Sequence, residues 1–302
     1  MIFRLTFLGT SASVPSAERN HPALLVEAGG HRILVDCGEG TQRQLLRSGA
    51  GFRRLHRLLL THAHFDHILG IPGLFSTLRL RQSDELLTVH GGQDTLDVVV
   101  RVLAGLWGAG RAPISLRFEP LTPGRLFDAD EFTIDCFQVR HRDTDSYGFV
   151  LETPPRRHLR ADQLTSLDVP DGPIRKELVE GRSITLADGR TVASEDVLGP
   201  LERGKRLVII GDTEATDGLA EHARGADLLV IEATFLDRDA PMARDYGHLT
   251  AAQAASLAAT SDVKQLVLTH ISGRYTDEEI LAEAVGTFPN SRIAADLDVL
   301  TV

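Results

Sequence analysis

The sequence predicts an α/β fold with a functional site at one rim of its sheets. Four short apolar runs have the composition of buried strands, and each ends within two residues of a His, Asp or Glu side chain. In α/β folds the carboxyl ends of such strands meet at a common edge. A strand can end in a polar residue for solvation alone, but four such endings favour a site. The runs are 58–60, 207–210, 228–231 and 266–268, followed by His62, Asp212, Glu232 and His270.

Other segments supply further strands and the helices that cover them. Phe3, Leu5 and Phe7 alternate with polar residues, which predicts a half-buried antiparallel strand. Two more extended segments, joined by a pair of glycines, are expected at 23–27 and 32–35. Helices are predicted at 41–47, 93–106, 250–259 and 277–285.

Length and composition indicate a globular enzyme, which we interpret as a single domain over 1–302. The chain has 302 residues, and 42% of them are hydrophobic, enough for a substantial core. Its formal net charge is -10, so contact with a polyanion has to be local. The cysteines, Cys37 and Cys136, are far apart in sequence, which suits a reducing, cytoplasmic compartment. We expect neither a leader nor a membrane span.

Residues 154–200 interrupt the pattern of buried strands. They contain a Pro-Pro pair, an arginine-rich stretch, the sequence Val169-Pro170-Asp171-Gly172-Pro173 and an expected hairpin at 188–189. This composition predicts an inserted, flexible, protruding arm rather than a second core. A disordered linker is the alternative.

The densest chemical signal is the segment 61–67, Thr-His-Ala-His-Phe-Asp-His. In an extended chain His62, His64 and Asp66 lie on one side, and a turn after Asp66 would bring in His67. Three imidazoles and a carboxylate suit zinc. A surface histidine cluster or a structural metal site is the alternative interpretation.

This segment has too many ligands for one tetrahedral ion and too few for two, so further ligands are expected elsewhere. His141 follows a predicted strand at 132–139, and Asp212 and His270 follow two of the apolar runs. Each could be an ordinary polar residue, but their joint placement after strands favours metal binding. In this pattern the chain resembles the metallo-β-lactamase superfamily along nearly its whole length. That resemblance implies a four-layer αβ/βα sandwich.

The resemblance also implies a binuclear centre with two Zn2+ per subunit. Such a pair lowers the pKa of a water molecule to about 7 and clamps the oxygens of a phosphoryl group. Manganese could occupy the same nitrogen and oxygen ligands. The implied ligands are His62, His64 and His141 for one ion, Asp66, His67 and His270 for the other, and Asp212 between them.

Within the superfamily the chain is similar to the ribonuclease Z family. The resemblance implies a zinc-dependent endoribonuclease that cleaves the 3′ trailer from precursor tRNA and leaves a 3′-hydroxyl. The matching segments are 8–12 with Pro15, Arg19 and Asn20, then 35–42, 146–149, 211–213, 232–235, 247–250 and 269–275.

The same resemblance implies roles for four residues near the metal centre. Asp66 would also accept the proton of the attacking water, and His248, oriented by Glu232, would act as general acid. Arg274 would hold a substrate phosphate through its planar guanidinium. Asp66, His248 and Arg274 could each instead be structural polar residues.

Three positions depart from the family pattern. Ile231 stands where a His often precedes the Glu, Leu249 replaces a Ser, and Glu214 follows Asp-Thr where a basic residue is frequent. The implied metal ligands are unchanged, so hydrolysis is still expected. What the three departures affect is which RNA the enzyme prefers. This includes whether an existing CCA end blocks cleavage and whether the enzyme also trims RNA exonucleolytically.

The resemblance further assigns the arm to tRNA binding and implies a homodimer. The segment 169–173 is similar to the Gly/Pro-containing exosite that grips the tRNA elbow, and one subunit's arm would serve the other's active site. The main alternative is a small-molecule phosphodiesterase, lactonase or thioesterase of the same fold, which needs no arm. A non-enzymatic RNA-binding module is a more distant one. The basic residues expected to contact phosphates are Arg156, Arg157, Arg160, Arg175 and Lys176.

Overall fold

The structure is a computed structural model that describes residues 2–82, 85–110, 112 and 114–302. It divides into two compact units: Met1–Glu152 together with Arg206–Val302, and Thr153–Lys205. None of the helices within the described residues has the length and hydropathy needed to cross a bilayer.

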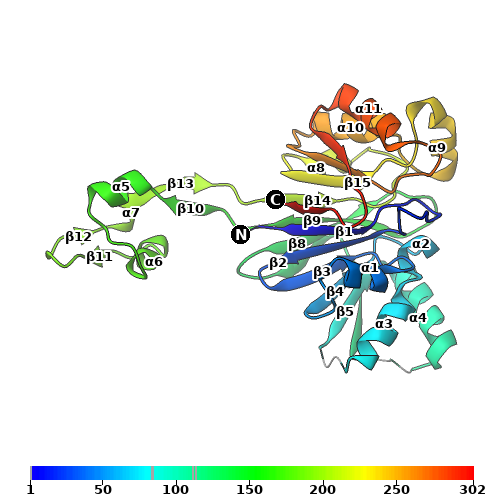
Figure 1. Cartoon of the computed structure of the whole chain (residues 1–302), viewed down its shortest axis with the longest axis horizontal. Helices are drawn as coiled ribbons and strands as arrows, with labels where there is room; N and C mark the ends of the chain where they lie inside the picture. Colours follow the sequence, from blue (N-terminus) through cyan, green and yellow to red (C-terminus); the bar gives the residue numbers. More distant parts are fainter. Residues whose placement is uncertain (1, 83–84, 111, 113) are drawn as a thin grey trace. The chain divides into compact units, whose positions relative to one another are not determined.

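The larger unit contains two mixed sheets of seven strands each (Figure 1). In both sheets one half pairs antiparallel and the other half parallel. The first sheet has the order β18 (Val299–Thr301), β1 (Arg4–Gly9), β2 (Ala23–Ala28), β3 (His31–Val35), β4 (Leu55–Leu59), β5 (Leu87–Gly91), β6 (Leu116–Pro120). The second has the order β17 (Ser291–Ile293), β16 (Leu266–Thr269), β15 (Leu228–Glu232), β14 (Arg206–Ile209), β9 (Ser146–Glu152), β8 (Thr133–Val139), β7 (Gly124–Asp128).

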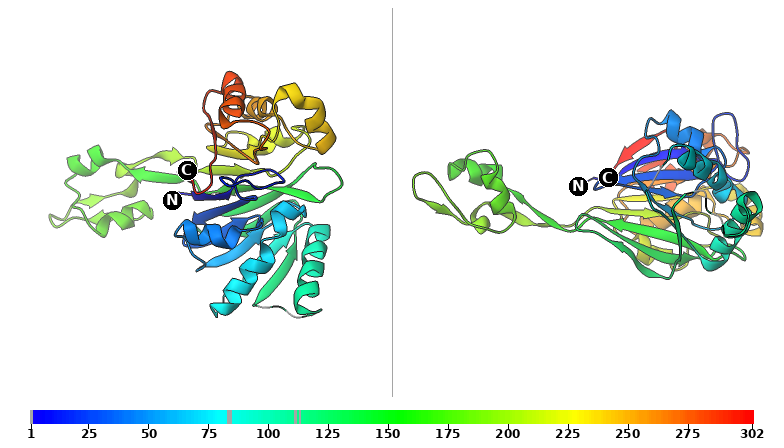
Figure 2. Two further views of the ribbon diagram at one scale, coloured as in Figure 1. Left: turned by 45° about the vertical axis from the view of Figure 1, so that its right-hand side comes forward. Right: turned by 90° about the horizontal axis from the view of Figure 1, so that it is seen from below.

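Helices cover the outer face of each sheet, and Figure 2 shows this arrangement from two further directions. Three clusters of buried apolar side chains fill the three spaces between layers: one between the sheets, and one under each helical layer. The predicted four-layer sandwich is therefore confirmed. The helices are α1 (Thr41–Arg47), α2 (Phe65–Ile68), α3 (Ile71–Leu80) and α4 (Gln93–Trp107) on the first sheet's side, and α8 (Leu219–Ala223), η1 (Asp237–Asp239), α9 (Ala240–Tyr246), α10 (Ala251–Thr260) and α11 (Asp277–Thr287) on the second's.

The first strand differs from its prediction. Phe3, Leu5 and Phe7 are buried as expected, but Thr6, on the opposite face, is only 2% exposed. The reason is position: β1 pairs on both edges, with β18 and β2, and α1 lies against it. A period-2 pattern reports side-chain polarity, and it does not reveal that a helix covers the polar face.

The parallel strands end at one rim, as the apolar runs predicted. β4 leads into His62, β14 into Asp212 and β16 into His270, while Glu232 is the last residue of β15. Backbone hydrogen bonds between the end of β3 and the end of α2 hold the histidine-rich segment 61–67 at this rim. Cys37 N donates to His67 O at 2.8 Å, and Gly70 N donates to Cys37 O at 2.9 Å. A Cβ at Gly70 would lie 1.9 Å from Gly38 O, so only glycine permits this contact.

The smaller unit has a core of its own, contrary to the expectation of an arm without one. Seven apolar residues cluster there, including Leu178 and Val197, which are fully buried. Proline-rich turns obscured this pattern because each apolar run is only a few residues long. The elements are β10 (Arg156–Leu159), α5 (Ala161–Ser166), α6 (Ile174–Val179), β11 (Ile184–Thr185), β12 (Thr191–Val192), α7 (Ser194–Val197) and β13 (Leu198–Glu202).

Candidate metal centre

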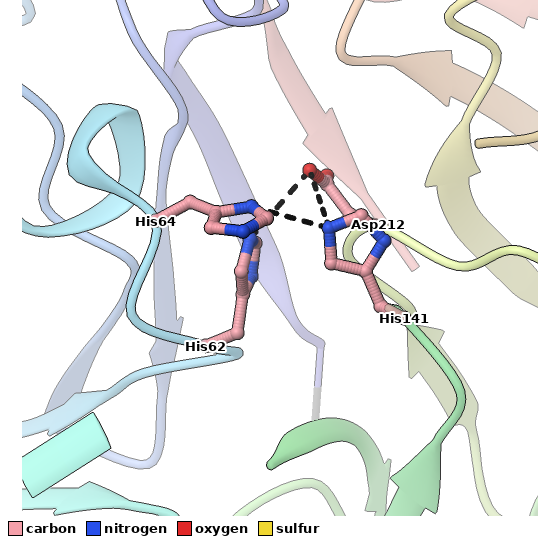
Figure 3. Close-up of side chains that lie close together, drawn as sticks. All are labelled: His62, His64, His141 and Asp212. Atoms are coloured by element: carbon pink, nitrogen blue, oxygen red, sulfur yellow. Dashed lines mark hydrogen bonds and ion pairs between the residues drawn. The ribbon is translucent and has the colours of Figure 1, made fainter. Parts of the chain in front are cut away.

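The carboxylate of Asp212 lies at the centre of a cluster of imidazoles. Its Oδ2 is 3.4 Å from His270 Nε2, 3.5 Å from His67 Nε2 and 3.7 Å from His62 Nε2. His141 Nε2 follows at 3.9 Å. Figure 3 shows the side chains of His62, His64, His141 and Asp212 turned toward one another.

The predicted ligands fall into two groups, and the carboxylate of Asp212 lies close to both. Ligand atoms of His62, His64, His141 and Asp212 all lie within 4.8 Å of one another, as do those of Asp66, His67 and His270. Asp212 Oδ2 is close to nitrogens of both groups, at 3.7 Å from His62 Nε2 and 3.4 Å from His270 Nε2. The structure thus brings together all seven residues, which come from four separate chain segments.

Four of these histidines are held in the tautomer that a metal ligand needs. His67 Nδ1 donates to Asp36 at 2.8 Å, and His141 Nδ1 donates to the carbonyl of Gly247 at 2.7 Å. His62 Nδ1 lies 3.0 Å from Thr61 Oγ1, and His270 Nδ1 lies 2.9 Å from Thr234 Oγ1. A neutral imidazole that donates through Nδ1 presents a lone pair at Nε2. In its neutral form each of these four imidazoles therefore offers an Nε2 lone pair to the cluster.

Unsatisfied polar atoms show that this donor set fits a cation. Within the described residues, His62 Nε2, His67 Nε2 and Asp212 Oδ1 are buried and have no hydrogen-bond partner. An unpaired buried polar atom costs about 1–3 kcal/mol, so such atoms are rare unless a ligand satisfies them. Here three of them face one cluster of nitrogen and carboxylate ligands, the donors that a divalent transition metal binds.

Burial and the mixed charges set the protonation states. Burial lowers the pKa of His62 well below its usual value, and it also lowers the pKa of His64 and of His141. Burial acts to raise the pKa of the Asp212 carboxyl, but the neighbouring His270 and His67 hold it well below its usual value. Burial opposes protonation of His67, but the charges of Asp212, Asp36 and Asp66 outweigh it and raise the pKa of His67 well above its usual value. The cluster thus combines the neutral imidazoles of His62, His64 and His141 with an ionised carboxylate, which favours cation binding.

His248 lies at the edge of the cluster, and its hydrogen-bond partner is a carboxylate that is not one of the predicted metal ligands. Its Nδ1 lies 3.0 Å from Glu232 Oε1, and Glu232 is fully buried. Thr213 N and Thr234 Oγ1 also donate to this carboxylate, at 2.8 and 2.6 Å. Burial opposes protonation of His248, but the charge of Glu232 outweighs it and raises the pKa to about 9. The pair is arranged to keep a proton on this imidazole.

Three supporting residues had no role in the sequence analysis. Asp36 accepts hydrogen bonds from Thr61 N, Thr61 Oγ1 and His67 Nδ1, each at 2.8 Å, and Thr234 connects Glu232 to His270. All three are polar residues at or just beyond strand ends, which is the signal that identified the ligands. Arg274 is exposed and takes no part in the described cluster.

In the smaller unit, the predicted phosphate-binding residues are mostly paired with carboxylates. Arg157 bonds to Glu195, Arg160 to Asp162, and Lys176 lies 3.6 Å from Glu180. Arg175 pairs with Asp171 and donates to the carbonyls of Val169 and Pro170, so it braces the loop 169–173. Over residues 153–205 nine basic side chains balance nine acidic ones. This unit is formally neutral in a chain of net charge -10.

Comparison with known proteins decides the family. A family model described as anti-Pycsar protein Apyc1 matches residues 3–168, and a beta-lactamase superfamily domain model matches residues 166–271. The chain is 71% identical to a ribonuclease Z of Bradyrhizobium diazoefficiens over 301 residues, which is 100% of both chains. The chain belongs to the ribonuclease Z family. For this ribonuclease Z family member, the cluster is the metal centre of a metal-dependent endonuclease.

Solved structures place this ribonuclease Z family member in the metallo-β-lactamase fold. The short form of human tRNase Z has a TM-score of 0.68 at 26% identity and covers 98% of each chain. The metallo-beta-lactamase fold protein YhfI from Bacillus subtilis has a TM-score of 0.71, covers 100% of each chain and is 19% identical, so it shows the fold alone.

The support that Asp36 gives to His67 can be tested with Asp36→Asn. An amide accepts the histidine's proton less strongly than a carboxylate does, so metal affinity is expected to fall by about 10- to 100-fold. Competition with a chromogenic chelator measures this affinity. Asp97→Asn, which changes an exposed carboxylate on α4, is the matched control and should leave affinity unchanged. Equal affinities in both variants would contradict the supporting role.

Proposed function

We propose that this chain uses two zinc ions to remove the 3′ trailer from precursor tRNA, leaving a 3′-hydroxyl on the tRNA. The observation that carries the proposal is the shared carboxylate of Asp212 between two groups of buried nitrogen and oxygen ligands. One ion would be held by His62, His64 and His141 and the other by Asp66, His67 and His270. The substrate is supported by the similarity to a ribonuclease Z and to human tRNase Z.

When bound, the ions would supply Lewis-acid chemistry: a water made acidic and charge neutralised at the phosphate. The side chains supply the proton transfers. Asp66, whose Oδ2 accepts from Ser13 N at 3.0 Å, takes the proton of the attacking water. As the bond from phosphorus to the 3′-oxygen breaks, His248 gives its proton to that oxygen. The balance leaves a hydroxyl on the tRNA and a 5′-phosphate on the trailer.

The smaller unit is proposed to bind the folded RNA by shape. Its formal charge is zero, and Arg175 holds the loop 169–173 in place, so a fixed surface rather than a strong field would recognise the tRNA elbow. We further propose a homodimer in which each arm serves the partner's site. Large apolar side chains exposed on α1–α3, including Leu46, Phe65 and Leu80, support association.

A cytoplasmic location is part of the same proposal. Cys37 and Cys136 are both free and buried, which suits a reducing compartment. Cell fractionation tests this.

Removal of the metal tests the central claim. A precursor tRNA with a 3′ trailer should be cut by the protein as purified and left intact after chelator treatment, because the ligands alone cannot acidify water. Zinc or manganese is then added back to find which ion restores cleavage, and elemental analysis should give two ions per chain. Cleavage that survives chelation would refute the mechanism. An intact precursor with the metal-loaded protein would favour a small-molecule hydrolase.

The acid role of His248 predicts a dependence on the leaving group. His248→Ala should lower kcat for precursor tRNA by about 10²- to 10⁴-fold, since a 3′-oxygen leaves poorly without a proton. Hydrolysis of bis(p-nitrophenyl) phosphate, whose leaving group is already stable as an anion, should fall much less. Metal content is expected to be unchanged. Equal losses on the two substrates would argue against proton donation by this residue.

The arm and the dimer can be tested together. Thr153 N donates to Lys205 O at 2.9 Å, so two glycines can join these residues in place of the unit between them. The kcat/KM of this variant for precursor tRNA should fall by more than about tenfold, because the loss of binding contacts worth only about 1.4 kcal/mol already has that effect. The variant should still hydrolyse bis(p-nitrophenyl) phosphate, which does not need the arm.

Co-expression with a full-length His248→Ala chain adds the test of the dimer. One mixed dimer then combines an intact site with a partner's intact arm, so cleavage of precursor should return. Full cleavage by the armless protein alone would remove the arm from the proposal, and a failure to regain cleavage would contradict an arm acting across the dimer.

A further inference from the structure

A groove of about 460 Å³ opens beside His248, outside the cluster of metal ligands. Its volume is within the range of sites that hold a small organic molecule, about 300–1,000 Å³. His248 is therefore shared between the metal centre and this groove. The lining residues are Arg140, Glu214, Ala240, Arg244, His248 and Gln253.

The groove is built from the same segments that carry the site. Arg140 directly precedes His141, Glu214 comes two residues after Asp212, and Arg244 comes four residues before His248. Hydrogen bonds join these segments: Glu214 N donates to Arg140 O at 2.9 Å, and His141 Nδ1 donates to Gly247 O at 2.7 Å. A molecule bound in the groove would thus have a set position relative to the reacting atoms.

Two guanidinium groups face this groove. The Arg140 side chain is 67% exposed, and its Nε lies 3.6 Å from Glu214 Oε1, too far for a hydrogen bond. Glu214 itself accepts a hydrogen bond from Arg142 N at 2.9 Å. Arg244 is exposed, and in the described part of the chain its guanidinium has neither an ion pair nor a hydrogen bond. Such groups favour a phosphate, which two arginines can bind through several donors.

We propose that the groove holds the nucleotide that carries the leaving 3′-oxygen, with Arg140 and Arg244 on the phosphate that precedes it in the RNA. The inference rests on the proposed function, from which it takes the 3′-hydroxyl product and the acid role of His248. The acid has to reach the leaving oxygen, and His248 forms part of the groove wall. The nucleotide on the tRNA side of the cut therefore lies against this wall, and the trailer extends away from it.

Arg244→Ala tests the proposal, because its guanidinium has no structural partner among the described residues. The ratio of kcat/KM for precursor tRNA to kcat/KM for bis(p-nitrophenyl) phosphate should fall by about ten- to a hundredfold, since only the RNA has a preceding phosphate. The loss should lie mainly in KM, and Arg244→Lys, which keeps the charge, should restore part of it. Arg101→Ala, which removes an exposed arginine of α4, is the matched control and should behave as wild type.

A modified substrate identifies which phosphate is bound. An uncharged methylphosphonate is placed at the phosphate 5′ to the nucleotide that carries the leaving oxygen. It should lower kcat/KM of the wild type about as much as Arg244→Ala does, and cause little further loss in that variant. The inference would be overturned if the losses caused by the variant and by the modified phosphate multiplied when combined. It would also be overturned if the effect of Arg244→Ala depended only on a methylphosphonate placed in the trailer. If the wild type fails to cut the unmodified precursor, the proposed function fails with it, a different outcome from an Arg244→Ala enzyme that matches the wild type.

Discussion

The buried carboxylate of Asp212 is the feature on which the rest of the site depends. An isolated carboxylate taken out of water costs far more free energy than a domain has in reserve, so it needs opposite charge and hydrogen-bond donors around it. The structure surrounds Asp212 with imidazole nitrogens at 3.4–3.9 Å and leaves Oδ1 without a hydrogen bond in the described residues. Imidazoles that present lone pairs cannot satisfy this oxygen. Cations can, which is why this site is a metal centre rather than a set of internal ion pairs.

Both sheets contribute to the centre, so its geometry depends on how they pack. Asp36, Thr61 and the segment 62–67 follow strands of the first sheet, while His141, Asp212 and His270 follow strands of the second. The apolar cluster between the sheets, with Phe7, Phe149 and Val230 among its buried members, sets their separation. A change of volume in that cluster would shift one half of the ligand set against the other, because packed interiors transmit strain.

The proposed function assigns chemistry and substrate recognition to different parts of the chain. The hydrogen-bonded pair of His248 and Glu232, to which the proposed mechanism gives the proton transfer, lies within the network of the metal centre, where Thr234 bonds to both Glu232 and His270. The smaller unit has its own core and its own internal ion pairs, so it can fold as a surface independent of the hydrolytic machinery. An acidic chain with a neutral smaller unit and two exposed arginines, Arg140 and Arg244, near the site would confine RNA attraction to the places where contact is productive.

The sequence by itself determined the fold class, the ligand types and the family. Those follow from local information: apolar runs that mark strands, His and Asp residues at their ends, and motifs of contiguous residues such as 61–67. The tertiary structure alone decided the rest. That Asp212 faces both ligand groups, and that Asp36 and Thr234 orient imidazoles distant in sequence, depends on contacts between segments up to a hundred or more residues apart. It also decided that Thr6 is buried and that 153–205 has a core, because burial is a property of what packs against a segment and not of the segment's own pattern.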